Sequence, residues 1–337
     1  MTSPAHNNFQ EGALRVKSEV SSAAPTRFHL GLHRFALVLA SCIFVLIVAG
    51  ALVTSEDAGL SVPDWPTSFG SIYKIPPLVG GVKFEHTHRM IAEGVGLLTI
   101  LFCIAAFRID RRKWLRNLTF AAIGTVIAQG ILGGITVLWF LPWYISSAHA
   151  GLGQTFFAIA VLLALYTGRD WMESVPETFP DNCNDELTPS TQTLAWLSIV
   201  AIYLQLFFGA AFRHSGMSIL PHLVNAVLVS GVLAWTSIRV LSRYGQVPQL
   251  RRPAAIMTGL LLLQLGFGFA AYLTRVVWGK NAVQPLPSMV STTVAHVAIG
   301  ALLLATSFVL EEQVRRHVVR GHVAVAERSP ARKAISA

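Results

Sequence analysis

Charged residues are scarce in this sequence. Asp, Glu, Lys and Arg make up 13% of the 337 residues, about half of their usual share in a soluble domain, whereas apolar residues make up 53%. So little charge excludes an ordinary soluble domain and predicts a polytopic membrane protein. The formal charge of +9 does not indicate nucleic-acid binding, because the basic residues lie in tails and short loops between apolar runs, where they set membrane orientation.

Cysteine is also rare. Cys42 and Cys103 lie in apolar runs and Cys183 in a polar loop, and there is no Cys-x-x-Cys pair or Cys/His metal spacing. Zinc and iron–sulfur sites of the usual kind are therefore not expected. The first 34 residues also lack the short apolar core of a secretory signal peptide, so we expect a polar N-terminal tail.

Long apolar runs are what the sequence has in abundance. Each run is long enough to span a bilayer, and each must be helical there, because a helix satisfies its backbone polar groups within its own segment. The predicted fold is an all-α membrane protein with eight transmembrane helices. The eight runs are 35–54, 87–107, 118–140, 147–167, 193–212, 220–239, 254–273 and 290–309.

Most Lys and Arg residues fall on the side of the membrane that holds both termini. The positive-inside rule then places both termini in the cytoplasm, and we expect a multi-pass protein of a bacterial-type inner membrane. The polar, acidic stretch after the fourth run suits a linker between two four-helix halves. The predicted division is N-terminal tail 1–34, bundle 35–168, linker 169–192, bundle 193–310 and C-terminal tail 311–337.

Two long loops, 55–86 and 274–289, lie on the opposite, outer side of the membrane. Both contain tryptophan and proline, a composition that favours a loop packed as a cap over the helix ends. The alternative is an interfacial loop whose tryptophans lie at the lipid headgroups.

An internal repeat runs through alternate helices. Three of the odd-numbered runs contain Gln-x-x-x-Gly, and the first has Leu46 in place of Gln, followed by Gly50. Residues four apart share a helix face, and glycine there permits close approach of another helix or of a flat ligand. The alternative is ordinary packing of small residues, with the glutamines bonding across helices. The three pairs are Gln129 with Gly133, Gln205 with Gly209 and Gln264 with Gly268.

Each even-numbered run carries a histidine near its outer end, followed four residues later by Ala or Gly. A single histidine in a membrane helix is usually a hydrogen-bonded polar residue, but four at matching depth are hard to explain in that way. Two imidazoles from facing helices, with room beside them for a flat ring, are the ligand set of a bis-histidine haem. The predicted pairs are His88 with His149 and His222 with His296.

The two histidine pairs are not equivalent. Glu85 precedes His88 by one turn, whereas Ile219 and Thr293 occupy the corresponding positions in the second pair. A carboxylate beside a haem can move protons or stabilise a cationic intermediate, whereas a haem held by two histidines alone favours electron transfer. We therefore predict a catalytic N-terminal half, with Glu85 as the catalytic residue, and an electron-transferring C-terminal half.

Other ionisable residues near the outer face have more than one interpretation. His86 and His214 are expected at the interface or behind the ligands. Glu93, a carboxylate well inside a run, either relays protons or pairs with a neighbouring glutamine, and the sequence does not choose. Three arginines are candidate partners for haem propionates, with surface anchoring as the alternative: Arg89, Arg213 and Arg275.

Taken together, these residues resemble the haem A synthase family. The resemblance spans about residues 35–310 and is specific as a set, because Glu-x-x-His-Arg occurs with three further histidines in alternate helices. It is carried by segments 59–66 (Gly-Leu-Ser-Val-Pro-Asp-Trp-Pro), 85–89, 149–154, 221–222 and 296–300.

The resemblance implies two pseudo-symmetric four-helix bundles. It also implies an enzyme that oxidises the C8 methyl group of haem o to a formyl group, giving haem a for cytochrome oxidase. By this resemblance, His222 and His296 hold a haem b cofactor. His88 and His149 hold the substrate, with Glu85 essential to the oxidation.

The family resemblance also suggests partners. They are haem o, membrane lipid, the farnesyltransferase that forms haem o, cytochrome oxidase assembly factors, an electron donor of unknown identity and a second copy of the chain; nucleic acid is not among them. Many bacterial members carry two cysteines in the first outer loop, where this chain has Val62 and Ser68. A mechanism that relies on a disulfide there does not carry over.

Two other functions fit the histidines. A di-haem b-type membrane cytochrome that exchanges electrons with quinone needs the same four ligands, and a haem transporter or assembly scaffold binds haem without turnover. Glu85 beside only one pair argues against the cytochrome. The farnesylating enzyme is disfavoured, because the chain lacks the paired Asp-rich motifs that a magnesium–diphosphate site needs.

Overall fold

A computed structural model of the protein describes residues 28–72, 74–173 and 184–320. Its eight long helices are α2 (Leu30–Ser55), α3 (Val82–Ile109), α4 (Lys113–Leu138), α5 (Trp143–Thr167), α7 (Thr191–Arg213), α8 (Leu220–Arg243), α9 (Pro248–Ala271) and α10 (Pro287–His317). A short helix, α6 (Arg169–Glu173), follows α5, and α9 continues as a π-helix, η2 (Tyr272–Trp278). Among the described residues, the β-structure is one short parallel pair, β1 (Asn184–Asp185) with β2 (Val319–Arg320).

All eight predicted transmembrane runs are confirmed as helices long and apolar enough to cross a membrane, so the chain is a multi-pass membrane protein. Most helices are longer than the apolar runs, because their ends continue into polar residues that hydropathy does not count. α2 begins at Leu30, inside the predicted N-terminal tail, and α10 continues to His317, past the predicted boundary at 311. α3 begins at Val82, so Glu85 and His86, which the sequence placed in the outer loop, are helical.

Large apolar side chains cover the outer surfaces of the long helices. Val227 and Ile238 on α8, and Leu262 and Phe269 on α9, are all exposed. Such an extensive apolar surface is an aggregation liability in a soluble protein, but it suits helices whose outer faces contact lipid tails. The apolar residues of these helices therefore contact lipid on the outer surface as well as one another in the core.

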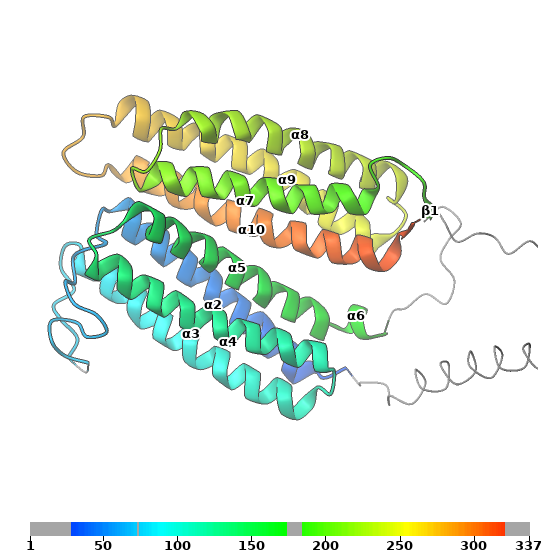
Figure 1. Cartoon of the computed structure of the whole chain (residues 1–337), viewed down its shortest axis with the longest axis horizontal. Coiled ribbons are helices and arrows are strands. Elements are labelled where there is room, and N and C mark those ends of the chain that lie inside the picture. Colours follow the sequence, from blue (N-terminus) through cyan, green and yellow to red (C-terminus); the bar gives the residue numbers. More distant parts are fainter. Residues whose placement is uncertain (1–27, 73, 174–183, 321–337) are drawn as a thin grey trace, which may run out of the picture.

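The helices pack as two groups of four. In the first group α2 and α4 each contact α3 and α5, and in the second α7 and α9 each contact α8 and α10. Figure 1 shows the two groups lying one against the other; at the seam α10 contacts α2 and α5, and α5 contacts α7. Each group has an apolar core, and Ala301 and Ala305 of α10 join the first. The arrangement is compatible with two pseudo-symmetric bundles; the symmetry and the domain boundaries stay predictions.

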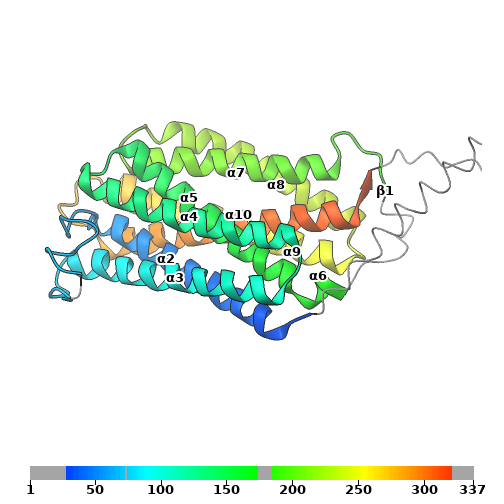
Figure 2. The same ribbon diagram turned by 60° about the horizontal axis from the view of Figure 1, so that its bottom comes forward.

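The outer loops and the chain ends lie at opposite ends of the helix bundle. Figures 1 and 2 show the loop that follows α2 and the loop that follows η2 at one end, with the start of α2 and the end of α10 at the other. Residues 1–27, 73, 174–183 and 321–337, which include most of both predicted tails, the middle of the predicted linker and Cys183, lie outside the described residues.

The helices α2, α4 and α7 end with the same backbone arrangement. In each, a residue with positive φ follows the helix: Asp57 (51°), Phe140 (57°) and Ser215 (63°). At least three amides of each turn donate to carbonyls near the end of the helix, which satisfies carbonyls that the helix leaves free. α4 therefore ends at Leu138, before the predicted residue 140. α9 departs from the pattern, because it continues as η2.

The turn after α7 packs across the seam between the two groups. Gly216 in this turn lies against the indole of Trp143 at the start of α5, and a Cβ at Gly216 would overlap ring atoms. We predict that Gly216→Ala lowers the midpoint of thermal unfolding in detergent, because overpacking costs about 1–3 kcal/mol. Gly231→Ala on α8 is the control, since a Cβ there meets no atom within 4 Å. Equal midpoints for the two variants would contradict the seam contact.

Candidate functional site

The four predicted histidines lie in the opening turns of helices that begin at the outer end. His88 and His149 are equally far from the first residues of their helices, α3 and α5. His222 lies in the first turn of α8, and His296 lies in the third turn of α10. Because these four helices all run away from the outer loops (Figure 1), the four rings collect toward one end of the bundle.

Each histidine ring packs against a glycine of the preceding long helix. A Cβ built on that glycine would lie 2.9–3.3 Å from Cε1 of the ring in all four cases, closer than nearly all real Cβ contacts. The sequence left open whether these glycines admit a helix or a flat ligand, and the structure shows that each admits an imidazole ring. The four contacts are Gly50 with His88, Gly133 with His149, Gly209 with His222 and Gly268 with His296.

The glutamines of the repeat bond to the same histidines. In the second group of helices the side-chain amide reaches the ring, and in the first it reaches the backbone carbonyl of the histidine. These bonds tie three of the four histidines to the neighbouring helix from a second direction; His88 has Leu46 in place of a glutamine. The contacts are Gln205 Nε2 to His222 Nε2 (3.3 Å), Gln264 Nε2 to His296 Nε2 (3.3 Å) and Gln129 Nε2 to His149 O (2.9 Å).

The backbone of the preceding helix also faces each ring. Nδ1 of His222 donates to the carbonyl of Gln205 at 3.2 Å. A neutral imidazole with its proton on Nδ1 keeps a lone pair on Nε2, which is the form that binds a metal. The other three rings face the backbone of the equivalent residue, Leu46, Gln129 or Gln264. Their Nδ1 atoms are buried and have no well-aligned hydrogen-bond partner among the described residues.

The two histidines of the second group face each other. The ring centroids of His222 and His296 are 6.2 Å apart, and the ring planes are inclined by 79°. An iron bound by two imidazole nitrogens at about 2.0 Å each requires centroids roughly 6 Å apart. The pair therefore fits a bis-histidine haem in spacing and in donor type. In the first group, His88 and His149 are close enough to interact electrostatically.

Glu85 is buried one turn before His88, with 4% of its surface exposed. Its Oε1 accepts a hydrogen bond from Nη2 of Arg89 at 2.6 Å, and its Oε2 accepts one from the backbone N–H of Val62 at 2.8 Å. Hydrogen bonds that involve a charged group contribute about 1.5–3 kcal/mol each. These two bonds compensate for the burial of the carboxylate and join helix α3 to the first outer loop.

Both terminal nitrogens of Arg89 bond to the same loop. Nη1 donates to the carbonyls of Asp64 at 2.7 Å and Thr67 at 3.1 Å, and Nη2 donates to the carbonyl of Val62 at 3.0 Å. The guanidinium thus lies between the Glu85 carboxylate and three loop carbonyls. The predicted role of Arg89 with a haem propionate stays a prediction.

The first outer loop is also ordered by its own side chains. Asp64 accepts hydrogen bonds from the hydroxyl of Thr67 and from two amides of the following turn, at 2.7 and 2.8 Å. Slight burial raises the pKa of Asp64, but these hydrogen bonds outweigh it and hold that pKa below its usual value. His86 on α3 adds a contact of 3.1 Å between its Nδ1 and the hydroxyl of Ser68. The part of this loop from Val62 to Ser68 is therefore bonded to α3, and the cap over the helix ends stays a prediction.

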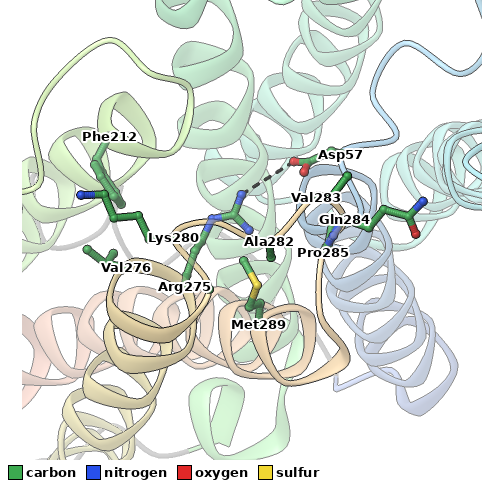
Figure 3. Close-up of a pocket in the computed structure, with 11 residues that line it drawn as sticks. Asp57, Phe212, Arg275, Val276, Lys280, Ala282, Val283, Gln284, Pro285 and Met289 are labelled. Carbon is green, nitrogen blue, oxygen red and sulfur yellow. Dashed lines mark ion pairs between the residues drawn. The ribbon is translucent and has the colours of Figure 1, made fainter.

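A second polar cluster joins the two groups of helices at the outer end. Asp57, just after α2, lies 3.6 Å from Arg213 at the end of α7 and 3.7 Å from Arg275 in η2. Arg213 also donates to the carbonyl of Thr54. Figure 3 shows Arg275 directed at Asp57 beside a pocket of about 430 Å³, which Lys280 also lines. Asp57 is 60% exposed, so these ion pairs are weak.

Two further ionisable residues were left open by the sequence. His214 follows the last residue of α7, and burial, then the positive charge of Arg213, lowers its pKa to about 4. His214 is therefore neutral near pH 7. Glu93 has an exposed side chain within α3.

Sequence reasoning missed the loop residues that bond to α3. Val62, Asp64 and Thr67 contact Arg89 through backbone carbonyls, which every residue has, so no side-chain pattern marks these contacts. The side chain of Asp64 was a usable signal, because Asp commonly bonds to the backbone of the turn that follows it.

Comparisons with known proteins show what this chain is similar to. A family model described as cytochrome oxidase assembly protein matches residues 82–221. A protein named Heme A synthase from Shouchella clausii is 29% identical over 245 residues, covering 70% of this chain and 75% of that protein. A protein of the same name from Symbiobacterium thermophilum is 28% identical over 189 residues, covering 56% and 60%. One from Hyphomonas neptunium is 30% identical over 156 residues, covering 43% and 42%.

The chain is thus similar to proteins named Heme A synthase, in one case over 70% of its length. The resemblance that the sequence indicated is thereby confirmed. The family model includes Glu85, His88 and His149 and ends just before His222. The family model therefore covers more of the first group of helices than of the second.

Proposed function

We propose that this chain is a haem A synthase, which oxidises the C8 methyl group of haem o to a formyl group and so gives haem a for cytochrome oxidase. The relatives named Heme A synthase support a role in haem A biosynthesis. The observation that carries the proposal is the repeated environment of the four histidines, each with its ring against a glycine of the preceding helix. Four such rings make two bis-histidine sites, one for a cofactor and one for the substrate.

In this proposal His222 and His296 hold a haem b cofactor, which supplies one-electron transfer when bound there. The chain's own residues prepare the pair. The carbonyl of Gln205 accepts the Nδ1 proton of His222, which puts the lone pair of that ring on Nε2. The side-chain amides of Gln205 and Gln264 lie 3.3 Å from the Nε2 atoms of His222 and His296, so a bound iron would take the place of these amides at the two lone pairs.

His88 and His149 hold haem o in the first group, with Glu85 as the catalytic residue. Glu85 lies one turn from His88 in a buried position. Nη2 of Arg89 donates to Oε1, and the N–H of Val62 donates to Oε2. A carboxylate held in this way is able to take up a proton released when the methyl group is oxidised and to stabilise positive charge beside it.

Arg213 and Arg275 are proposed partners for haem propionates. Nε of Arg213 and Nη1 of Arg275 are buried and unpaired among the described residues. Guanidinium–carboxylate bonds are strongest where both groups are partly shielded from water, and both arginines are mostly buried. Arg89 is proposed as a third propionate partner, in addition to its hydrogen bonds with the loop and with Glu85.

The same proposal places the chain in a bacterial-type inner membrane with both termini in the cytoplasm. It is supported by the start of α2 and the end of α10, which share one end of the bundle (Figure 1), together with the predominance of Lys and Arg in the segments at that end. The proposed partners are haem o, membrane lipid, the farnesyltransferase that forms haem o, cytochrome oxidase assembly factors, an electron donor and a second copy of the chain.

A di-haem b-type cytochrome that exchanges electrons with quinone is the second candidate. One observation favours it: the carboxylate of Glu85 is engaged by both Arg89 and Val62. Extracting the pigments of the purified protein and identifying them by mass separates the two functions. Haem o, haem a or a hydroxylated intermediate would support the synthase, whereas haem b alone would support the cytochrome.

Gly268→Ala tests the cofactor site without replacing a ligand. The new Cβ would lie 2.9 Å from Cε1 of His296, so the ring must move. We predict about 10–100-fold weaker retention of haem b, the usual cost of misorienting a metal ligand, measured as b-type absorbance per protein. Gly266→Ala on the same helix is the control, because a Cβ there meets no atom within 4 Å. If both variants keep full absorbance, His296 is not a ligand.

Glu85→Gln removes the proposed catalytic charge and keeps an oxygen for Val62. A positioned acid–base group contributes about 10²–10⁴-fold to a rate, so we predict that haem a formation falls by about 100-fold or more. The b-type absorbance from His222 and His296 should be unchanged. The measurement is quantification of haem o and haem a by mass after turnover in cells. Haem a formation at the normal rate would show that Glu85 is not catalytic.

A further inference from the structure

We infer that residues 61–70 form a fixed lid over the outer end of the first helix group, with Arg89 as the positioning residue that latches it. We also infer that Trp65 of this lid forms a wall of the site between His88 and His149. The identity of the ligand at that wall, a flat porphyrin with a long prenyl chain, rests on the proposed function. The latch itself rests on the contacts alone.

The latch is a closed set of bonds between α3 and one short stretch of loop. Arg89 donates to the carbonyls of Val62, Asp64 and Thr67, and to the carboxylate of Glu85. Glu85 in turn accepts from the N–H of Val62. A planar guanidinium presents its donors in a rigid fork and reaches several acceptors at once, whereas the ammonium of lysine is a single point charge on a flexible chain.

A second attachment holds the far end of the lid. Nδ1 of His86 lies 3.1 Å from the hydroxyl of Ser68, and both side chains are buried. Between the two attachments, Asp64 accepts bonds from Thr67 and from the next turn. Three side chains near the start of α3, at 85, 86 and 89, therefore hold the lid in place, and none of them is a proposed ligand of haem iron.

On the other side the lid reaches α4. The indole of Trp65 lies on Gly134, where a Cβ would be 2.5 Å from Cδ2 of the ring. The preceding residue, Gly133, packs against the ring of His149. The lid thus extends from the helix that carries His88 to the helix that supports His149. Trp65 remains 38% exposed, which leaves aromatic surface for a flat ligand to pack against.

The position of the lid can be measured with a thiol at residue 62. Val62 is 0% exposed, and its bonds to Glu85 and Arg89 use backbone atoms, so Val62→Cys adds a buried thiol and removes no latch contact. The variant is made in the full chain with Cys42, Cys103 and Cys183 replaced by Ala or Ser. The rate of labelling by a water-soluble maleimide then reports how often the lid opens.

The next test asks whether the guanidinium group of Arg89 is required, or whether a positive charge at this position is enough. We expect labelling at residue 62 to be about tenfold faster or more in Arg89→Gln, because losing one hydrogen bond to a charged group shifts an opening equilibrium by that factor. Arg89→Lys should also label fast, since lysine keeps the charge but not the fork. Slow labelling in Arg89→Gln, or full rescue by Arg89→Lys, would overturn the latch.

The contact with α4 is tested without touching Glu85, Arg89 or a histidine. Gly134→Ala should speed labelling at residue 62, because the new Cβ displaces Trp65. Gly130→Ala on the same helix is the matched control, since a Cβ there meets no atom within 4 Å. Adding Trp65→Ala to Gly134→Ala removes the overlap and should return labelling to the slow rate. Equal rates for Gly134→Ala and Gly130→Ala would overturn the contact.

The wall formed by Trp65 is tested by adding haem o to the purified protein, which already holds haem b, and measuring haem o binding. Trp65→Ala and Gly134→Ala should each weaken haem o binding by about tenfold, with the b-type absorbance unchanged. Unchanged haem o affinity in a variant whose labelling shows a displaced lid would overturn the wall. If the protein neither binds nor converts haem o, the proposed function and the wall fail, while the labelling rates still decide whether Arg89 latches the lid.

Discussion

Inside a bilayer an imidazole has no water to bond to, and the helix arrangement depends on how the chain accommodates four such rings. Each ring occupies the space that a glycine leaves on the preceding helix. The contact brings two backbones close together, and in three cases a glutamine one turn away bonds to the same histidine. Spacing and register of neighbouring helices are therefore set by the same contact that positions the rings.

Charge is placed where it links separate elements. Glu85 and Arg89 connect α3 to the first outer loop, and Asp57 connects the two helix groups through Arg213 and Arg275. All of these residues lie at or near the ends of spans, where a charged group still finds polar partners within the protein. The apolar helices supply the frame and the histidines, whereas the charged residues hold the outer parts of the frame together.

Much of this was predictable from the sequence. Hydropathy located the eight helices, because lipid permits few alternatives to a helix, and recurrence singled out the four histidines. Hydropathy did not locate the helix ends, since polar first turns such as the one that holds Glu85 are helical too. The partners of the glycines were not predictable either, because a residue without a side chain carries no sign of what packs on it. The contacts of Arg89 could not be predicted, because they are made to backbone carbonyls, which every residue has.

The ion pair between Arg275 and Asp57, which joins the two groups, depends on the number of residues in the π-helix η2. Each hydrogen-bonded turn of a π-helix contains one residue more than an α-helical turn, so η2 holds surplus chain at the point where Arg275 reaches Asp57. Deleting one residue between 272 and 274 would turn Arg275 by about 100° about the axis of a regular α-helix. An insertion or deletion in this segment therefore changes how the two halves are joined even when Asp57 and Arg275 themselves are unchanged.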